Sequence, residues 1–240
     1  MLEGAEDADV ETSSDGYAGR FAGPVGRFFL DVQARATLEL LASWPRASIL
    51  DVGGGHGQLT GPLVDAGHEV TIYGSAAVCE ERVRPWTGNG RARFRSGDLL
   101  KTPFAERSFD VVVSYRLLPH VARWTELIAE LSRLARVAVL VDYPTSRSVN
   151  AVAEMLFGLK KRVEGNTRPF MVFKDEQVIG AFAAAGLRPT ARRPQFFVPM
   201  ALHRALRSAP LSQAMERVSS ALGLTRSYGS PVLARFERDA

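Results

Sequence analysis

The chain has 240 residues, 46% of them hydrophobic, which is enough for one globular domain with a buried core. No hydrophobic run reaches the roughly 18 residues of a membrane span, and the N-terminal sequence MLEGAEDADVETSSDGY is acidic where a signal peptide would be basic and then hydrophobic. A cytoplasmic protein without a transmembrane segment is therefore expected. The single Cys79 excludes an internal disulfide and supports neither redox chemistry nor a metal site.

The net charge of +4 conceals an asymmetry along the chain. Residues 1–144 carry 15 Lys and Arg against 19 Asp and Glu, whereas residues 145–240 carry 15 against 7. A basic region can face nucleic acid, an anionic membrane surface or an anionic small molecule. The basic residues occur in scattered groups without an RNA-recognition or helix-turn-helix pattern, so no nucleic-acid partner is expected. Peripheral contact with a membrane stays open.

The N-terminal region divides into two predicted parts. Residues 1–16 are polar and acidic without hydrophobic periodicity, which predicts a disordered tail. From Val25 to Trp44 hydrophobic residues recur at helical spacing, which predicts an amphipathic helix. Residues 17–46 are therefore expected to form a helical cover on a single domain that extends over 17–240.

Residues 47–143 alternate short hydrophobic runs with helical segments. Runs such as VVV at 111–113 are hydrophobic on both faces, as a strand covered by helices on both sides must be. This order predicts an α/β fold with a doubly wound, mainly parallel sheet. After Pro144 the sequence predicts a helix in SVNAVAEMLFGLKKRV, a helix in KDEQVIGAFAAAG, a strand in RPTARRPQFFV, a helical insert over Met200–Leu224 and a last strand in SPVLARFER.

The segment DVGGGHG at 51–57 is the first candidate site. Its glycines Gly53, Gly55 and Gly57 have the spacing G-x-G-x-G, whereas a dinucleotide fold needs G-x-G-x-x-G, which argues against a nicotinamide-dependent reductase. A turn between a strand and a helix still offers backbone N–H groups to an anionic ligand. Asp51 would repel a pyrophosphate and suits a ligand with an ammonium beside its carboxylate, such as S-adenosylmethionine. A turn that serves only tight packing is the alternative.

A family resemblance rests on three segments in order, ILDVGGGHG, SGDLLKTPFAERSFDVVVSYRLLPHV and LSRLARVAVLVDYP. With them, residues 47–142 resemble the Rossmann-like class I S-adenosylmethionine-dependent methyltransferases, most closely the ubiquinone and menaquinone biosynthesis branch. The resemblance implies transfer of a methyl group from S-adenosylmethionine to an acceptor.

The resemblance also implies which residues bind the cofactor. Asp51, Gly53 and Gly55 would face its methionyl part. Asp98 and the backbone of Leu99 would meet the adenine, which agrees with a carboxylate accepting from an exocyclic amine. Ser114 to Arg116 would line the methionine side.

The chain departs from the family at the end of EVTIY, where an acid that accepts both ribose hydroxyls is replaced by Gly74. Losing such a charge-assisted pair would cost about 1.5–3 kcal/mol. Ser75 or the backbone can supply the contacts instead. The alternative is lost or weakened cofactor binding, and then the chain would be a binding or regulatory module without turnover.

In-line methyl transfer needs above all a nucleophile held about 3 Å from the methyl carbon. His120, just after the predicted fourth strand, is the candidate general base for an acceptor that must lose a proton, and a structural histidine at a helix start is the alternative. Tyr143, at the end of the fifth strand, is the second candidate.

The acceptor is expected to lie against two lid elements, residues 144–173 and 198–226, which mix hydrophobic and basic side chains. Lys161, Arg168 and His203 are the candidate acceptor-binding residues there. This mixture suits a small or lipid-like acceptor, such as a quinone or an aromatic acid, although packed helices with solvated basic ends would look the same. The sequence leaves the acceptor, the methylated atom and the oligomeric state open.

Overall fold

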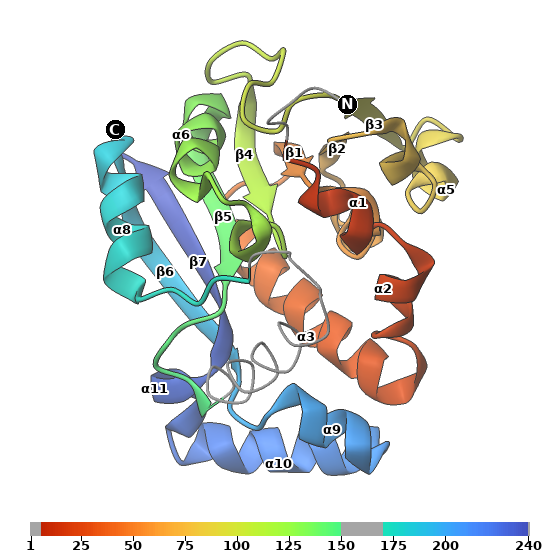
Figure 1. Ribbon diagram of the computed structural model, residues 1–240, viewed down its shortest axis with the longest axis vertical. Helices are drawn as coiled ribbons and strands as arrows, with labels where there is room; N and C mark the ends of the chain where they lie inside the picture. The colour runs from red at the N-terminus through yellow and green to blue at the C-terminus, as the bar shows by residue number, and fades with distance from the viewer. Residues whose placement is uncertain (1–5, 150–169, 240) are drawn as a thin grey trace.

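The computed structural model describes residues 6–149 and 170–239, and these form a twisted sheet between layers of helices (Figure 1). The strand order is β3-β2-β1-β4-β5-β7-β6. β1 to β5 pair in parallel, and β7 runs antiparallel between β5 and β6. The prediction of a mainly parallel, doubly wound sheet is confirmed. The strands are β1 Ser48–Val52, β2 Glu69–Gly74, β3 Ala92–Ser96, β4 Phe109–Ser114, β5 Ala135–Tyr143, β6 Leu187–Phe196 and β7 Ser230–Arg238.

The helices sort onto the two faces of the sheet because successive strand residues point to opposite sides. Ile49, Val111 and Val113 pack with the hydrophobic side chains of α3 and α4, whereas Leu50 and Val112 pack with those of α6 and α8. The helices are α3 Gly23–Leu41, α4 Thr60–Asp65, α5 Arg84–Thr87, α6 Trp124–Leu134, α8 Asp175–Ala184, α9 Met200–Leu206, α10 Ala209–Ala221 and α11 Leu224–Tyr228, with short 3₁₀ turns η1 Gly54–His56, η2 Ala77–Glu80 and η3 Leu118–His120. Within the described ranges, none of the helices has the length and hydrophobicity needed to cross a membrane.

The N-terminal segment differs from the prediction. Residues 6–16 were expected to belong to a disordered tail, but they lie within or beside two short helices, α1 Ala8–Thr12 and α2 Asp15–Gly19. Ser14 caps α2 by accepting a hydrogen bond from the backbone N–H of Tyr17 at 3.2 Å. Ala8 and Asp9 are buried against the sheet. The prediction of disorder is wrong here because tertiary burial, which composition does not reveal, holds the segment in place.

The helices α9, α10 and α11 form the lower end of the molecule in Figure 1, where α9 and α10 lie side by side. The predicted helical insert is split at Arg207, whose φ of 50° is left-handed. Glu216 on α10 ties this end together, because it accepts hydrogen bonds from the backbone N–H groups of Phe197 and Val198 at 3.1 and 3.0 Å. Its carboxylate also lies 3.0 Å from Nε2 of the fully buried His203.

Candidate functional site

The glycine turn joins β1 to α4 and needs its glycines for two physical reasons. Gly53 and Gly57 have φ values of 75° and 70°, the left-handed region that side chains disfavour. A side chain at Gly54 would overlap the Asp51 carboxylate, and one at Gly55 would overlap Ser13. The turn is therefore packed against its own strand on one side and against the N-terminal segment on the other.

Asp51 lies beneath this turn with no exposed surface. Neither of its carboxylate oxygens has a hydrogen-bond partner, and burial raises its pKa from 3.8 to about 7. A buried carboxylate without a donor is costly, and a cationic ligand group nearby would remove that cost. The Asp51 carboxylate thus fits the ammonium of a methionyl group, which would donate to it.

Other buried polar atoms without partners surround the same turn. They include Asp9 Oδ1, Ser75 Oγ and His56 Nε2. Such atoms are uncommon in folded proteins, and their concentration here indicates a place where a ligand completes the hydrogen bonds. Burial and then the positive charge of Arg116 lower the pKa of His56 to about 3, so its ring is neutral at pH 7. Because His56 Nδ1 accepts from the backbone N–H of Gln58 at 3.2 Å, the proton of the neutral ring is assigned to Nε2.

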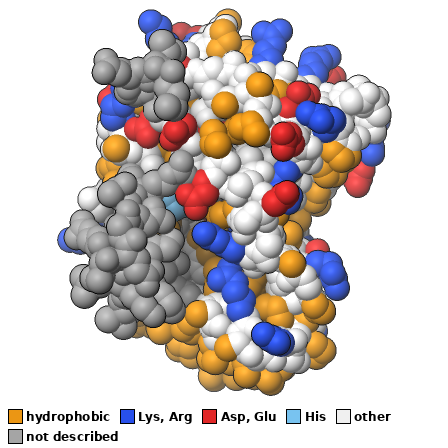
Figure 2. Space-filling model, turned by 45° about the vertical axis from the view of Figure 1, so that its right-hand side comes forward, with side chains coloured by type: hydrophobic (Ala, Val, Ile, Leu, Met, Phe, Trp, Pro, Cys, Tyr) orange, Lys and Arg blue, Asp and Glu red, His pale blue; other side chains and the backbone are white. Residues whose placement is uncertain are grey.

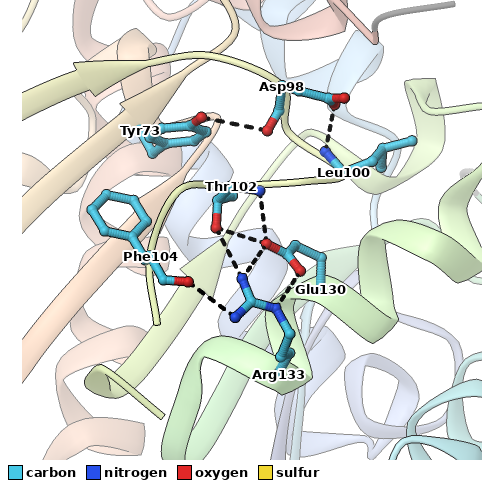
Figure 3. Close-up of polar contacts among 7 residues, drawn as sticks. All are labelled: Tyr73, Asp98, Leu100, Thr102, Phe104, Glu130 and Arg133. Atoms are coloured by element: carbon cyan, nitrogen blue, oxygen red, sulfur yellow. Dashed lines mark hydrogen bonds and ion pairs between the residues drawn. The ribbon is translucent and has the colours of Figure 1, made fainter. Parts of the chain in front are cut away.

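The loop after β3 presents Asp98, the residue that the resemblance assigns to adenine (Figure 3). Its carboxylate accepts from the backbone N–H of Leu100 at 2.9 Å, and its carbonyl accepts from the Tyr73 hydroxyl at 3.4 Å. Leu99 is completely buried in the core. These contacts hold the loop in place around Asp98. The Asp98 side chain itself stays partly exposed at the sheet edge.

A polar network below Asp98 fixes the rest of this loop (Figure 3). Glu130 on α6 accepts from the backbone N–H and the hydroxyl of Thr102 at 2.8 and 2.6 Å. Arg133 donates to Glu130 at 2.7 Å and to the carbonyl of Phe104 at 3.0 Å. Burial alone would raise the pKa of Glu130, but the hydrogen bonds from Arg133 and Thr102 hold it below its ordinary value.

The segment after β4 connects the glycine turn to a cavity. The Ser114 hydroxyl donates to the carbonyl of Val52 at 3.0 Å, and Leu117 packs against Gly53. Arg116 adopts a left-handed φ of 61°, and its guanidinium lies 4.1 Å from the ring centre of Phe21. These contacts place the residues expected to line the methionine side directly beside the turn.

Two residues that the sequence did not suggest hold Arg116 in this position. The carboxylate of Asp142, at the end of β5, accepts from the backbone N–H of Arg116 and from Gln33 Nε2 at 3.3 Å. Gln33 Oε1 accepts from the Arg116 guanidinium at 2.9 Å. Burial raises the pKa of Asp142 to about 6, although the charge of Arg116 opposes that rise. No sequence signal marks this triad, because its members lie on three separate elements.

The cavity has a volume of about 420 Å³ and lies between these strand ends and the helices α2, α3 and α9. Its wall contains several aromatic and basic side chains, among them Phe21, Phe29, Arg116, His120, Phe196 and Arg204. Figure 2 shows Lys and Arg side chains gathered near the centre of one face of the molecule, with hydrophobic side chains around and below them.

The candidate catalytic and acceptor-binding residues lie in different places relative to the cavity. His120 lines the cavity, and its ring centre lies 5.5 Å from that of Phe170. Tyr143 is buried beside Phe173 and does not line the cavity, nor does His203, which is buried against Glu216. Lys161 and Arg168 lie outside the described residues, as does much of the predicted lid over 144–173.

In the parts of the chain that the structure describes, no cluster of His, Cys, Asp and Glu could hold a metal ion.

Comparisons with known proteins agree with this geometry. Residues 50–138 match the family model described as a methyltransferase domain. No match was found among curated proteins. Magnesium protoporphyrin IX methyltransferase from Synechocystis PCC 6803 with bound S-adenosylhomocysteine is similar in structure, with 15% identity, coverage of 98% of each chain and a TM-score of 0.68.

Two further solved structures share the fold at similar identity. One is 1,6-didemethyltoxoflavin-N1-methyltransferase from Burkholderia thailandensis, with 16% identity, coverage of 87% of this chain and 77% of that one, and a TM-score of 0.57. The other is the [4+2]-cyclase SpnF, with 16% identity, coverage of 87% and 80%, and a TM-score of 0.61. The two proteins are named for different reactions, a methyl transfer and a cyclisation, so the fold alone does not define the chemistry.

The matched segment contains the glycine turn, Asp98 and the segment after β4, and the sheet is that of the class I fold. Residues 50–138 therefore match a methyltransferase domain, and the sheet that contains them has the fold of the class I, S-adenosylmethionine-dependent methyltransferases. S-adenosylmethionine is the cofactor of this type of domain. The match is to this general class and does not extend to the ubiquinone and menaquinone branch.

Replacing Asp51 by Asn should stabilise the ligand-free protein at pH 8 by about 1–3 kcal/mol, because the amide removes a buried charge that has no donor. The folded pKa of Asp51, about 7, lies above its ordinary value of 3.8, so the natural protein loses stability as the pH rises between them. The gain from Asp51→Asn should therefore shrink toward pH 5. Urea unfolding at both pH values measures it, and a gain that is equal at both would contradict the assignment.

Replacing Glu130 by Gln should destabilise the protein at pH 7 by about 1–3 kcal/mol, since the carboxylate accepts several hydrogen bonds. Because the folded pKa of Glu130 is below its ordinary value, its contribution is present above that value and is lost as the pH falls through the folded pKa. The difference from the natural protein should therefore shrink as the pH is lowered through the folded pKa. Glu126→Gln, on the exposed side of the same helix, is the control and should change little at any pH.

Proposed function

We propose that the protein transfers the methyl group of S-adenosylmethionine to a small aromatic or lipid-like acceptor held in the 420 Å³ cavity. The main support for this proposal is the position of residues 114–120 between the glycine turn and the cavity. Leu117 packs against Gly53 of the glycine turn, while Arg116, Pro119 and His120 line the cavity. One short segment therefore borders both the place for the cofactor and the place for an acceptor.

The residues around the turn have distinct roles in this proposal. Asp51 meets the ammonium of the methionyl group beside the turn that contains Gly53 and Gly55. Asp98 and the backbone of Leu99 meet the adenine, and the network of Glu130 and Arg133 keeps that loop in place. When bound, the cofactor would supply a methyl group on a sulfonium: an acceptor lone pair would form the new bond to the methyl carbon, and the electrons of the broken S–C bond would stay on sulfur.

The cavity wall suits a flat acceptor with an anionic group. Phe21, Phe29 and Phe196 supply hydrophobic contact area, and Arg116 and Arg204 supply positive charge. Asp142 and Gln33 fix the direction of the Arg116 guanidinium, so they are positioning residues. The rings named in the solved relatives, a porphyrin and a toxoflavin, are compatible with an aromatic acceptor.

His120 is the general base in this proposal when the acceptor is a hydroxyl group. It lies in the cavity wall after β4, and imidazole can accept a hydroxyl proton near neutral pH. Tyr143 and His203, being buried away from the cavity, have no role in our proposal.

The test is transfer of a radiolabelled methyl group from S-adenosylmethionine to a panel of phenolic acids and hydroquinones. For an accepted hydroxyl substrate, His120→Asn should lower turnover about 10²- to 10⁴-fold with cofactor affinity unchanged. His68→Asn is the matched control, because His68 precedes β2 at the opposite edge of the sheet.

Two outcomes would count against the proposal. Full activity of His120→Asn would show that His120 is not the general base. Binding of S-adenosylmethionine and S-adenosylhomocysteine with equal affinity and no transfer to any compound would favour the alternative of a binding module without turnover.

A further inference from the structure

Nucleotide-binding sheets usually place an acid at the end of the second strand, where its carboxylate accepts from a ribose hydroxyl. In this chain β2 ends at Gly74. A Cβ built at Gly74 would lie 2.8 Å from the Cβ of Cys79 and 3.3 Å from Oδ2 of Asp9. The structure therefore has no room for an acidic side chain at this position, but another carboxylate already occupies the neighbouring space.

That carboxylate belongs to Asp9 on α1. Its Oδ2 accepts from the backbone N–H of Ser75 at 2.8 Å and lies 3.5 Å from Sγ of Cys79. Asp9 has no exposed surface, and its second oxygen, Oδ1, is buried without a partner. One oxygen is thus fixed to the end of β2, and the other needs a donor.

The position of α1 is well defined by its contacts. The hydroxyls of Thr12 and Ser13 donate to the carbonyl of Asp9 at 3.1 and 2.7 Å, which closes the helix over this residue. Ser13 also packs against Gly55 of the glycine turn, and Ala8 enters the hydrophobic core. α1 is therefore part of the wall of the cofactor site rather than a tail beside it.

We propose that Asp9 replaces the missing acid of β2 and binds the ribose hydroxyls of the cofactor through Oδ1. The inference rests on the proposed function, because it requires an adenosyl ligand over the glycine turn. It also explains Gly74: with Asp9 in place, a second carboxylate at the strand end would meet both a steric overlap and a like charge. The chemical class recognised is a nucleoside with a free vicinal diol.

The first test is calorimetric binding of S-adenosylhomocysteine to the natural protein and to Asp9→Asn. Asn keeps the shape and can still accept from Ser75, but its amide nitrogen cannot accept from a hydroxyl. Affinity should fall about 10- to 100-fold, as expected for a lost charge-assisted hydrogen bond. Glu11→Gln removes one charge from the same helix at a partly exposed site that pairs with Arg20, and it should change affinity less than threefold.

A ribose-specific readout separates recognition from folding. The natural protein should bind the 2′-deoxyribose analogue of S-adenosylhomocysteine more weakly than the parent compound, whereas Asp9→Asn should not distinguish the two. Thermal stability of Asp9→Asn should equal or exceed that of the natural protein, because the variant no longer buries a charged carboxylate with one oxygen that lacks a donor. Unchanged affinity and unchanged discrimination would overturn the proposal.

A second test fixes α1 in place. Ser13 and Cys79, the single cysteine, both border the space at Gly55, so Ser13→Cys should form a disulfide with Cys79 on oxidation. The oxidised variant should bind S-adenosylhomocysteine as well as its reduced form does. Binding that is lost on oxidation and restored by reduction, or tighter binding by Asp9→Asn, would show instead that α1 competes with the cofactor.

Failure of this inference is distinguishable from failure of the proposed function. If the natural protein binds S-adenosylhomocysteine and Asp9→Asn binds it equally, the role of Asp9 is wrong and the function stands. If neither the natural protein nor the control Glu11→Gln binds S-adenosylhomocysteine, the cofactor assignment itself is wrong.

Discussion

Two carboxylates with no exposed surface, those of Asp51 and Asp9, flank the glycine turn. The free-energy cost of burying them is the constraint on which the rest of the site depends. Asp51 has no hydrogen-bond donor, and Asp9 has one oxygen without a donor. A folded protein tolerates such groups when a ligand completes them, because an unpaired buried charge costs several kilocalories per mole. An ammonium for Asp51 and a vicinal diol for Asp9 are both present on one adenosyl-methionine ligand.

The rest of the architecture keeps these groups where a ligand can reach them. Parallel strands end at one edge of the sheet, so β1, β2 and β4 bring the turn, Gly74 and Ser114 together although they are distant in sequence. The same edge carries Asp142, which with Gln33 holds Arg116 at the wall of the 420 Å³ cavity. In the function that we propose, cofactor recognition and acceptor recognition are therefore coupled through a few residues after β4.

The sequence predicted the parts of the fold that have a local pattern. Alternating hydrophobic runs and helical segments gave the parallel sheet, and the final strands around Arg192 and Arg235 were also expected. The glycine turn and the loop at Asp98 could be recognised because their function needs particular residues at fixed spacing. The family match over residues 50–138 covers these segments.

The sequence could not predict what depends on long-range packing. Asp9 lies 66 positions from Ser75, and its acidic surroundings suggested disorder rather than burial. Gln33 and Asp142 likewise meet across 109 positions. The sequence suggested His203 as an acceptor-binding residue because basic and hydrophobic residues are next to it in the chain. In the structure it is buried in the interior, 3.0 Å from the carboxylate of Glu216. In each case the decisive partner lies on another element.

The most direct measurement of the central claim is amide hydrogen exchange of the natural protein with and without S-adenosylhomocysteine. The ligand should slow exchange both at residues 51–58 of the glycine turn and at residues 8–13 of α1, because both would border the bound ligand. Faster exchange at residues 8–13 on ligand binding would contradict the account, since it would mean that the N-terminal helix leaves the site when the cofactor enters.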